Sequence, residues 1–238
     1  MVCVTTADSD PKSAFKLYQK KRRLFPDPRA ESLDGIVAMG DHLSVATLFE
    51  AYSFGIFPWP HEGLPTLWYS PDPRGVLDFE NLHINKSLKK FLKKHPFQVS
   101  FNQAFEKVMR KCAAVPRPGQ KGTWIHEPLI KAYCDFHQAG YAHSVEVWEA
   151  GKLVGGLYGV YVGGVFSGES MFFEKSNASK LALIKTIEVL QKNNLKWMDI
   201  QMVTPITEAL GGRYISKAEF YSRLEAAHHS AVAIDFTI

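Results

Sequence analysis

The stretch from His143 to Phe173 is the part of this 238-residue chain that most constrains its fold. It contains three segments of alternating side chains, SVEVWE, KLVGGLYGVYV and VFSGESMFF, separated by turns at Ala150-Gly151 and Gly163-Gly164. A period of two is typical of β-strands, so the stretch predicts a three-stranded meander. Glycines inside strands indicate bulges or the close approach of another group to the backbone. Four lie here: Gly155, Gly156, Gly159 and Gly168.

A helix and another strand are expected after the meander. Ser176 or Asn177 can cap a helix that runs to about Gln191, and KWMDIQ then predicts a short strand. A last helix is expected near residues 217–227, and the end of the chain, AVAIDFTI, predicts one more strand. The order of meander, helix and strand predicts a mixed α/β unit that resembles the core of GNAT-type acetyltransferases.

The N-terminal part predicts a smaller unit. Ser44 is a suitable N-cap for a helix through about Phe54, which Gly55 can end, and an aromatic loop, GIFPWP, follows. The run TLWYSPDPRGVLDF then predicts a strand, a proline-bounded turn and a second strand. We place a domain boundary in this turn, between a small N-terminal α/β domain over residues 1–72, which carries the FPW loop, and a GNAT-like domain over residues 73–238.

Positive charge is concentrated in residues 86–121, although the whole chain has a formal charge of only +4. The segment carries ten basic residues and one acid, Glu106, which gives it a net charge of +9. Like charges on one helical face repel, so an unrelieved lysine stripe favours phosphate binding. The segment therefore predicts a polyanion-binding surface. The candidate backbone contacts are Lys86, Lys89, Lys90, Lys93, Lys94, Lys107, Arg110 and Lys111, and the following loop adds Arg117 and Lys121.

Three polar residues interrupt strands that otherwise look buried. Asp199 and Gln201 are two positions apart, so on a regular strand both side chains project from the same face. Glu169 lies in the last strand of the meander. A carboxylate in such a position costs free energy unless it is paired or used, which makes these residues site candidates, although a strand-end Asp or Gln can equally cap a turn.

The turn from meander to helix bears on the acyl carrier. It reads FFEKSNASK and contains no glycine, so it lacks the permissive loop with which GNAT enzymes bind the pyrophosphate of acetyl-CoA. This disfavours acetyl-CoA as the donor, while the basic segment 86–121 favours another acyl carrier, tRNA.

A series of motifs identifies a family. In order they are GDHLSVATLFEAYSFGIFPW, LWYSPDPRGVL, GTWI, HSVEVWEAGKLVGGLYGV, FSGESMFFEKSNASK, DIQ and ALGG. Together they resemble leucyl/phenylalanyl-tRNA–protein transferases from about Gly35 to about Ala227. The resemblance implies a small N-terminal domain joined to a GNAT-like domain. It also implies transfer of Leu or Phe, with Met as a further donor, from aminoacyl-tRNA to the α-amine of proteins that begin with Arg or Lys, which marks them for degradation.

The resemblance also implies roles for individual residues. It assigns Asp199 and Gln201 to catalysis and Glu169 to acceptor binding. The aromatic residues that contact the 3′-terminal adenosine of the tRNA match Trp59, Trp124 and Tyr133, although a helical tyrosine is equally suited to packing. Positions of the aminoacyl pocket match Leu157, Phe166, Met171, Leu183, Thr186, Leu190 and Met198, all of which except Thr186 are also ordinary core residues. Thr186 departs from the bulky apolar residue that the family often has.

Some alternatives stay open. After DIQ the family usually has a Cys and then a His, where this chain has Ile200 and Ile206, so acceptors with N-terminal Asp or Glu are an alternative. A non-catalytic tRNA-binding protein on the same scaffold is another, and a tRNA-dependent transferase acting on a cell-wall precursor is a third. A protein acceptor assay separates the three.

Several properties are expected to be absent. Cys3, Cys112 and Cys134 match neither a disulfide framework nor a zinc pair, and the histidines show no HExxH pattern, so we expect no metal. Because an aminoacyl ester is already activated, no cofactor is expected. No stretch approaches the roughly 18 apolar residues of a membrane span, and the N-terminus does not resemble a signal peptide. We therefore expect a cytoplasmic protein.

Overall fold

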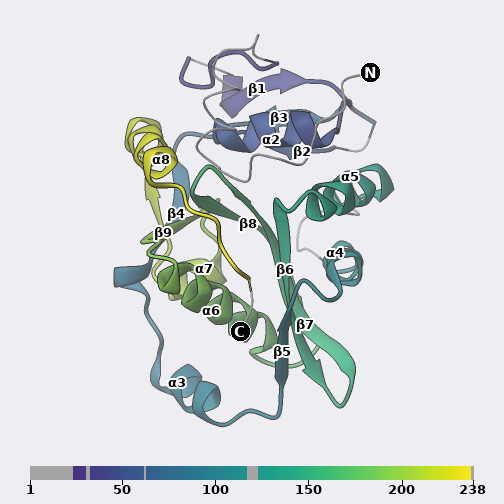
Figure 1. Cartoon of the computed structure of the whole chain (residues 1–238), viewed down its shortest axis with the longest axis vertical. Coiled ribbons are helices and arrows are strands. Elements are labelled where there is room, and N and C mark those ends of the chain that lie inside the picture. Colours follow the sequence, from purple (N-terminus) through teal and green to yellow (C-terminus); the bar gives the residue numbers. More distant parts are fainter. Residues whose placement is uncertain (1–23, 31–32, 62, 117–122, 237–238) are drawn as a thin grey trace.

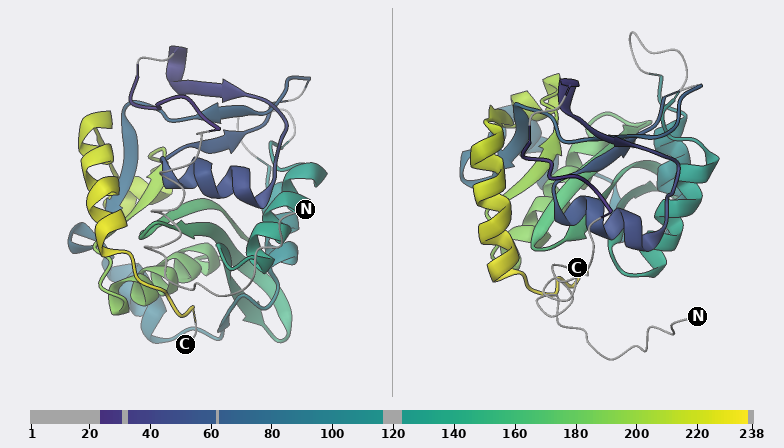
Figure 2. Two further views of the ribbon diagram at one scale, coloured as in Figure 1. Left: turned by 45° about the horizontal axis from the view of Figure 1, so that its top comes forward. Right: turned by 90° about the horizontal axis from the view of Figure 1, so that it is seen from above.

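The computed structural model describes residues 24–30, 33–61, 63–116 and 123–236 (Figure 1). Cys3, Arg117 and Lys121 lie outside these ranges. The described chain forms a three-stranded sheet, of order β1-β3-β2, and a seven-stranded sheet, of order β10-β4-β9-β8-β7-β6-β5. The small sheet lies at one end of the long axis, and α2 lies between it and the large sheet (Figures 1 and 2).

The strands are β1 (Ile36–Met39), β2 (Phe57–Trp59), β3 (Leu67–Tyr69), β4 (Arg74–Asp78), β5 (Gln98–Phe101), β6 (Ala142–Glu149), β7 (Lys152–Val162), β8 (Val165–Phe173), β9 (Trp197–Gln201) and β10 (Arg213–Ile215). The α-helices are α2 (Val45–Ser53), α3 (Lys86–Lys93), α4 (Phe105–Ala113), α5 (Glu127–Gln138), α6 (Ala178–Lys192), α7 (Pro205–Ala209) and α8 (Lys217–Ser230), and short 3-10 turns are η1 (Leu33–Gly35) and η2 (Phe79–Asn81).

Helix α2 begins and ends where the local sequence predicts. The hydroxyl of Ser44 accepts a hydrogen bond from the backbone N–H of Thr47 at 3.1 Å, which satisfies one free donor of the first turn. Gly55 follows the helix with a φ of 66°, a conformation that glycine adopts without strain. Leu48 and Ala51 are buried against the large sheet's helices, so both the helix and its orientation follow from its apolar face.

The predicted meander is confirmed as β6-β7-β8, and the mixed α/β class is confirmed with it. From β8 the chain crosses through α6 to β9, which pairs with β8 in parallel. Strand β4 joins the large sheet beside β9, although it follows the small sheet's β3 by only a proline turn. This placement brings Arg74 next to β9, and it was not predicted.

Both expectations for the strand glycines are confirmed. A Cβ atom on Gly155 would lie 2.5 Å from the Cβ of Ala178, so the absence of a side chain lets α6 approach the sheet. A Cβ on Gly156 would lie 2.7 Å from the carbonyl oxygen of Val145. At Gly159 the register between β7 and β8 shifts, which is a β-bulge.

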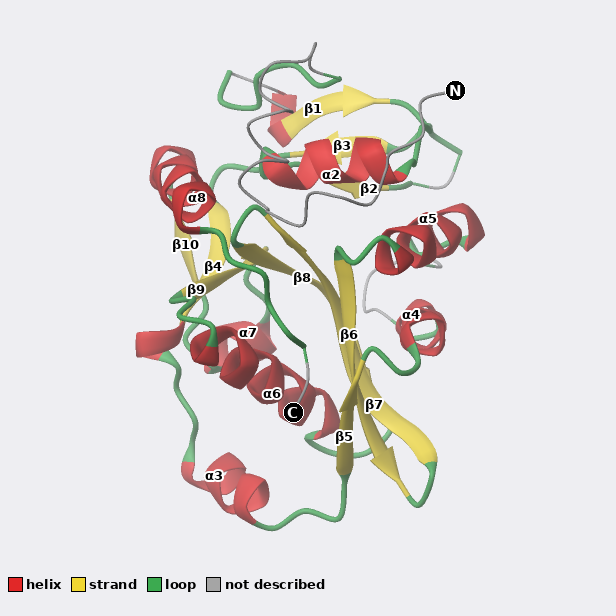
Figure 3. Cartoon of the chain, viewed as in Figure 1, coloured by secondary structure: helices red, strands yellow, loops and turns green. Residues whose placement is uncertain are grey.

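One local prediction is wrong. Residues 231–236 form no strand; Figure 3 draws them as loop after α8. They cross the sheet instead of extending one of its edges: Phe236 is 5% exposed and stacks on His143 with 4.0 Å between ring centroids. The hydroxyl of Tyr161 donates to the carbonyl of Val232 at 2.8 Å. Asn177 does precede α6, but its φ is 64° and its side chain forms no capping hydrogen bond.

Two apolar clusters lie on the two faces of the large sheet. One packs α2, α4, α5 and the small sheet against one face, and the other packs α6 against the opposite face. The first cluster contains residues from both sides of position 72, and the domain boundary stays a prediction. Within the described ranges, no helix has both the length and the apolar composition that crossing a membrane requires.

Candidate active site

The candidate site lies on the neighbouring strands β8 and β9. These two strands share one register pair in the described chain, Ser167 with Asp199. Beyond it, pairing with β7 passes from Gly159–Gly168 to Tyr158–Ser170, which leaves Glu169 as the extra residue of a bulge. Bulges re-aim side chains and often lie beside active sites. The local sheet geometry therefore turns Glu169 out of the regular alternation.

A second bulge lies in β9. Its pairing with β4 passes from Asp199–Val76 to Gln201–Gly75. Gln201 ends the strand with a φ of 59°, and its backbone N–H donates to Oδ1 of Asp199 at 2.9 Å. The two predicted catalytic residues are therefore neighbours on β9, as predicted, and a bulge interrupts the regular alternation between them.

Asp199 is almost completely buried, at 1% exposure, and four donors point at its carboxylate. Arg74 donates through Nε to Oδ1 at 2.9 Å and through Nη2 to Oδ2 at 2.7 Å. The hydroxyl of Ser167 donates to Oδ2 at 3.2 Å, and the N–H of Gln201 reaches Oδ1. A carboxylate offers about four lone-pair positions, so Asp199 is saturated.

Arg74 is the functional-site residue that the sequence analysis missed. It is 1% exposed, its Nη1 donates to the carbonyl of Gly55 at 2.9 Å, and its Cζ lies 5.0 Å and 4.4 Å from the ring centroids of Phe57 and Phe220. Arg74 therefore ties the small sheet, α8 and β9 together. The sequence does contain a signal for Arg74, because it is a charged residue at the start of the buried strand RGVLD. A charged residue in a buried strand is the criterion that singled out Asp199.

Glu169 has a different environment. Its side chain is half-buried, and Oε1 accepts a hydrogen bond from Nε2 of Gln201 at 2.7 Å. The hydroxyl of Tyr133 lies 3.5 Å from Oε2 and also forms a short hydrogen bond with the hydroxyl of Tyr52. Elements α2, α5 and β9 thus converge on one carboxyl group.

The surroundings of Glu169 raise the pKa of its carboxyl group to about 7. Burial is the largest cause, and the nearby negative charge of Asp199 adds to it. Hydrogen bonds from Tyr52 and Gln201, together with the charge of Arg74, oppose the rise. A carboxyl group with this pKa exchanges its proton near neutral pH.

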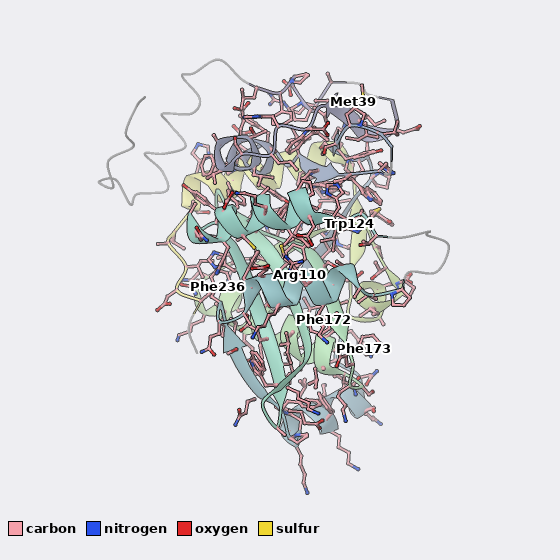
Figure 4. All side chains as sticks on the ribbon, turned by 90° about the vertical axis from the view of Figure 1, so that its right-hand side faces the viewer. Met39, Arg110, Trp124, Phe172, Phe173 and Phe236 are labelled. Carbon is pink, nitrogen blue, oxygen red and sulfur yellow. The ribbon has the colours of Figure 1, made fainter. Side chains whose placement is uncertain are left out.

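The three aromatic candidates lie on the same side of the large sheet, within or against the cluster that holds α2 and α5. Trp59 is partly exposed on β2, with 5.9 Å between its ring centroid and that of His61. Trp124 is partly exposed just before α5 (Figure 4). Tyr133 is fully buried and faces Glu169. Adenosine stacking stays a prediction for all three, and only the two tryptophans present part of a ring to solvent.

The basic candidates fall into two groups. The lysines of α3 are exposed, form no ion pair within the described ranges, and lie at the end of the molecule opposite the small sheet (Figure 1). Arg110 instead lies between α4 and α5 and pairs with both Glu106 and Glu127 (Figure 4). Lys111 pairs with Glu174. The predicted tRNA contacts are therefore unequal, because Arg110 and Lys111 already have carboxylate partners.

The predicted aminoacyl pocket lies on the α6 side of the large sheet. Its members within the buried cluster are Leu157, Phe166, Leu183, Leu190 and Met198, with Met171 packed against them. Thr186 is buried, and its hydroxyl donates to the carbonyl of Ala182 at 2.9 Å. The structure brings these residues together, and their role in binding a donor side chain stays a prediction.

Comparison with known proteins identifies the family. A family model described as leucyl/phenylalanyl-tRNA protein transferase matches residues 76–225, and a model of that family's N-terminal domain matches residues 41–72. The chain belongs to this family. A transferase from Anaeromyxobacter sp. (strain Fw109-5) is 45% identical over 212 residues, which cover 89% of this chain and 90% of that protein. One from Flavobacterium johnsoniae is 46% identical over 209 residues, covering 88% and 99%.

Leucyl/phenylalanyl-tRNA protein transferases are aminoacyltransferases, so the chain is an enzyme of that class. Among solved structures, a GCN5-related N-acetyltransferase from Kribbella flavida aligns with a TM-score of 0.39 and 10% identity, over 71% of this chain and 60% of that chain.

The two cysteines that the structure describes, Cys112 and Cys134, are poorly placed for nucleophilic catalysis. Cys112 is fully buried, and burial raises the pKa of the half-buried Cys134 thiol, which disfavours the reactive thiolate. Among the described residues, no group of three potential ligands could hold a metal ion.

Proposed function

We propose that this transferase moves Leu or Phe, with Met as a further donor, from aminoacyl-tRNA to the N-terminal α-amine of a protein. The observation that carries the proposal is the hydrogen-bonded cluster of Glu169, Gln201 and Asp199 on the neighbouring strands β8 and β9, in a chain of this family. An aminoacyl ester is already activated, so the enzyme must mainly position the ester and the amine. The proposed reaction therefore uses no cofactor and no metal.

We propose acceptors with N-terminal Arg or Lys. An acidic acceptor would be favoured if a neighbouring arginine neutralised Glu169. Arg74 is the nearby arginine, but it donates its hydrogen bonds to Asp199 and to the carbonyl of Gly55. Glu169 therefore keeps its negative charge available for a basic side chain when it is ionised. Acceptors modified in this way would be marked for degradation through the N-degron pathway in the cytoplasm.

We propose that the tRNA is held at two places. The partly exposed rings of Trp59 and Trp124 support stacking with the 3′-terminal adenosine, which is worth roughly 1–3 kcal/mol per base. The exposed lysines of α3, with Lys107 of α4, support contacts with phosphates farther along the tRNA. Charge neutralisation of this kind makes binding weaken as salt rises.

The proposal is tested by transfer of labelled Leu, Phe or Met from charged tRNA to peptides. The peptides begin with Arg, Lys, Asp, Glu or Ala and are otherwise identical. We expect Leu and Phe to be transferred to the Arg and Lys peptides. Transfer only to the Asp and Glu peptides would replace the acceptor assignment. Salt-dependent tRNA binding without transfer to any peptide would support a non-catalytic tRNA-binding protein instead.

A further inference from the structure

We propose that Glu169 is the group that accepts the proton of the attacking α-amine, and that Asp199 only positions its neighbours. This assignment rests on the proposed aminoacyl transfer and deepens it. It changes the roles that the resemblance implies: Asp199 loses the part of proton acceptor, and Glu169, whose charge attracts a basic acceptor side chain, gains it. The contrast between the two carboxylates supports it in three steps.

Asp199 has no accessible lone pair. Its carboxylate is buried and receives donors from Arg74, Ser167 and the backbone of Gln201, at distances of 2.7–3.2 Å. To accept a proton, it would have to break one of these hydrogen bonds and leave the guanidinium of Arg74 without its counter-charge inside the protein. An uncompensated buried charge is strongly destabilising, so Asp199 is suited to holding Arg74 and Gln201 in place.

The second step is that Glu169 keeps accepting capacity and access. Its donors are Nε2 of Gln201 on one carboxylate oxygen and the hydroxyls of Tyr133 and Tyr52. Three donors leave one of the roughly four lone-pair positions of the carboxylate for an incoming amine. The bulge in β8 takes Glu169 out of the regular alternation, and its side chain is half-buried beside Gln201 of β9. A general base must lie within hydrogen-bond reach of the proton that it removes, and Glu169 is the carboxylate of the cluster that permits this.

The third step concerns the charged and titratable groups around Glu169. Tyr52 of α2 and Tyr133 of α5 face it from one side, and Gln201 and Asp199 of β9 and Arg74 of β4 face it from the other. The pKa of about 7 that results lies close to the value of roughly 7.7–8.0 for an α-amine. Proton transfer between groups of similar pKa is efficient near neutral pH.

The proposed step is balanced. The lone pair of the neutral α-amine forms the N–C bond with the ester carbonyl carbon, and the carbonyl π electrons move to oxygen. The ionised carboxylate of Glu169 takes a proton from the new ammonium. As the carbonyl re-forms, the C–O bond to the terminal ribose breaks, and the protonated Glu169 returns the proton to the leaving ribose oxygen. The products are an amide and an uncharged tRNA hydroxyl.

The test compares Glu169→Gln with the wild type at saturating aminoacyl-tRNA, using peptides that begin with Arg or with citrulline. Citrulline has nearly the shape of arginine but no charge. We expect Glu169→Gln to lower kcat by about 10²–10⁴-fold for both peptides. A carboxylate that only recognises a basic side chain predicts a different result: a raised KM for the Arg peptide, an unchanged kcat, and no effect with citrulline. That outcome would overturn the proposal.

The pH profile gives an independent readout. Below pH 7 the wild type needs both a neutral amine and an ionised Glu169, so log kcat/KM should fall with a limiting slope of two. In Glu169→Gln only the amine titrates, so the slope should be one. Glu169→Asp should be slower than the wild type but keep the slope of two. If Glu169→Gln does not fold, the pH profile of Glu169→Asp replaces it as the test. Equal slopes in the wild type and Glu169→Gln would refute the assignment.

The control is Glu188→Gln, an exposed carboxylate on α6 that pairs with Lys185 and lies outside the proposed machinery. It should have wild-type kcat and a slope of two. If the wild type transfers nothing to any acceptor, the proposed function fails. If the wild type is active but the Glu169 variants behave as a recognition group requires, only the assignment of Glu169 fails.

Discussion

Asp199 and Glu169 lie on the neighbouring strands β9 and β8, but their environments suit them to different roles. Asp199 is suited to holding other residues in place, and Glu169 is suited to reacting. Asp199 is buried, and four donors use its lone pairs. Glu169 is half-buried, has fewer hydrogen bonds and has a pKa raised to about 7. The same contrast recurs among the cations: Arg110 is paired with two carboxylates, whereas the α3 lysines pair with none in the part of the chain that the structure describes. A charge that its neighbours already satisfy stabilises the fold, and one that is left available can act on a substrate.

The largest expected effect comes from separating Arg74 from Asp199. Arg74→Met keeps an apolar side chain between Phe57 and Phe220 but leaves Asp199 buried without its counter-charge. We expect a loss of about 3–5 kcal/mol in the free energy of unfolding, measured by urea denaturation.

The matched control for this pair is Arg74→Met combined with Asp199→Leu. An apolar replacement of a buried ion pair is often close to neutral, so the double variant should recover most of the loss. A single Arg74→Met variant as stable as the wild type would contradict the view that Asp199 is held by Arg74.

The second prediction concerns the pH dependence of stability at Glu169. Its pKa is raised from an ordinary 4.5 to about 7 in the folded state, so the folded state binds the proton more tightly than the unfolded state does. The contribution of Glu169 to stability is therefore full below about pH 4.5 and is lost as the pH rises through 7. Relative to Glu169→Gln, the wild type should lose on the order of 1–3 kcal/mol between pH 4.5 and 8.

Urea denaturation of both proteins at several pH values measures this difference. A constant difference in unfolding free energy across that range would show that Glu169 is not perturbed.

The third prediction concerns the tyrosines that face Glu169. Tyr52→Phe removes the hydrogen bond with Tyr133 and the contribution of Tyr52 that lowers the pKa of Glu169. We expect a stability loss of about 1 kcal/mol and a shift of the acid limb of kcat/KM to higher pH. Tyr141→Phe on the same side of the sheet is the control, and its acid limb should not move. An unchanged limb in Tyr52→Phe would separate this tyrosine from the proton-accepting group.

The smallest effects are expected among the cations. Replacing Lys89 and Lys90 together with Ala should lower the slope of log K against log salt for tRNA by roughly 0.7–0.9 per lost phosphate contact. Arg110→Ala removes a cation that Glu106 and Glu127 already compensate, so its slope should change less. Stability should change by less than about 0.5 kcal/mol in each case. Equal slopes for the two variants would show that pairing with carboxylates does not decide which cations contact the tRNA.

Local sequence determined much of the fold. The alternation of residues 143–173 predicted the meander, Ser44 and Gly55 predicted the two ends of α2, and the polar interruptions singled out Glu169 and Asp199. These signals are readable because strand and helix periodicity, capping and turn preferences act over a few residues. The predicted C-terminal strand is absent because an apolar run does not reveal its partners: residues 231–236 pack across the sheet against His143 and Tyr161 and do not pair with one of its edges.

The tertiary structure alone decided what each carboxylate is suited to do. Arg74 and Asp199 are 125 positions apart, and the ion pair exists because β4 joins the large sheet beside β9. The two bulges that turn Glu169 and Gln201 toward each other depend on the register with the neighbouring strands. Chemical type and spacing therefore singled out two carboxylates as site candidates. Only the surrounding donors, brought from distant parts of the chain, decide which one is satisfied and which is free to take a proton.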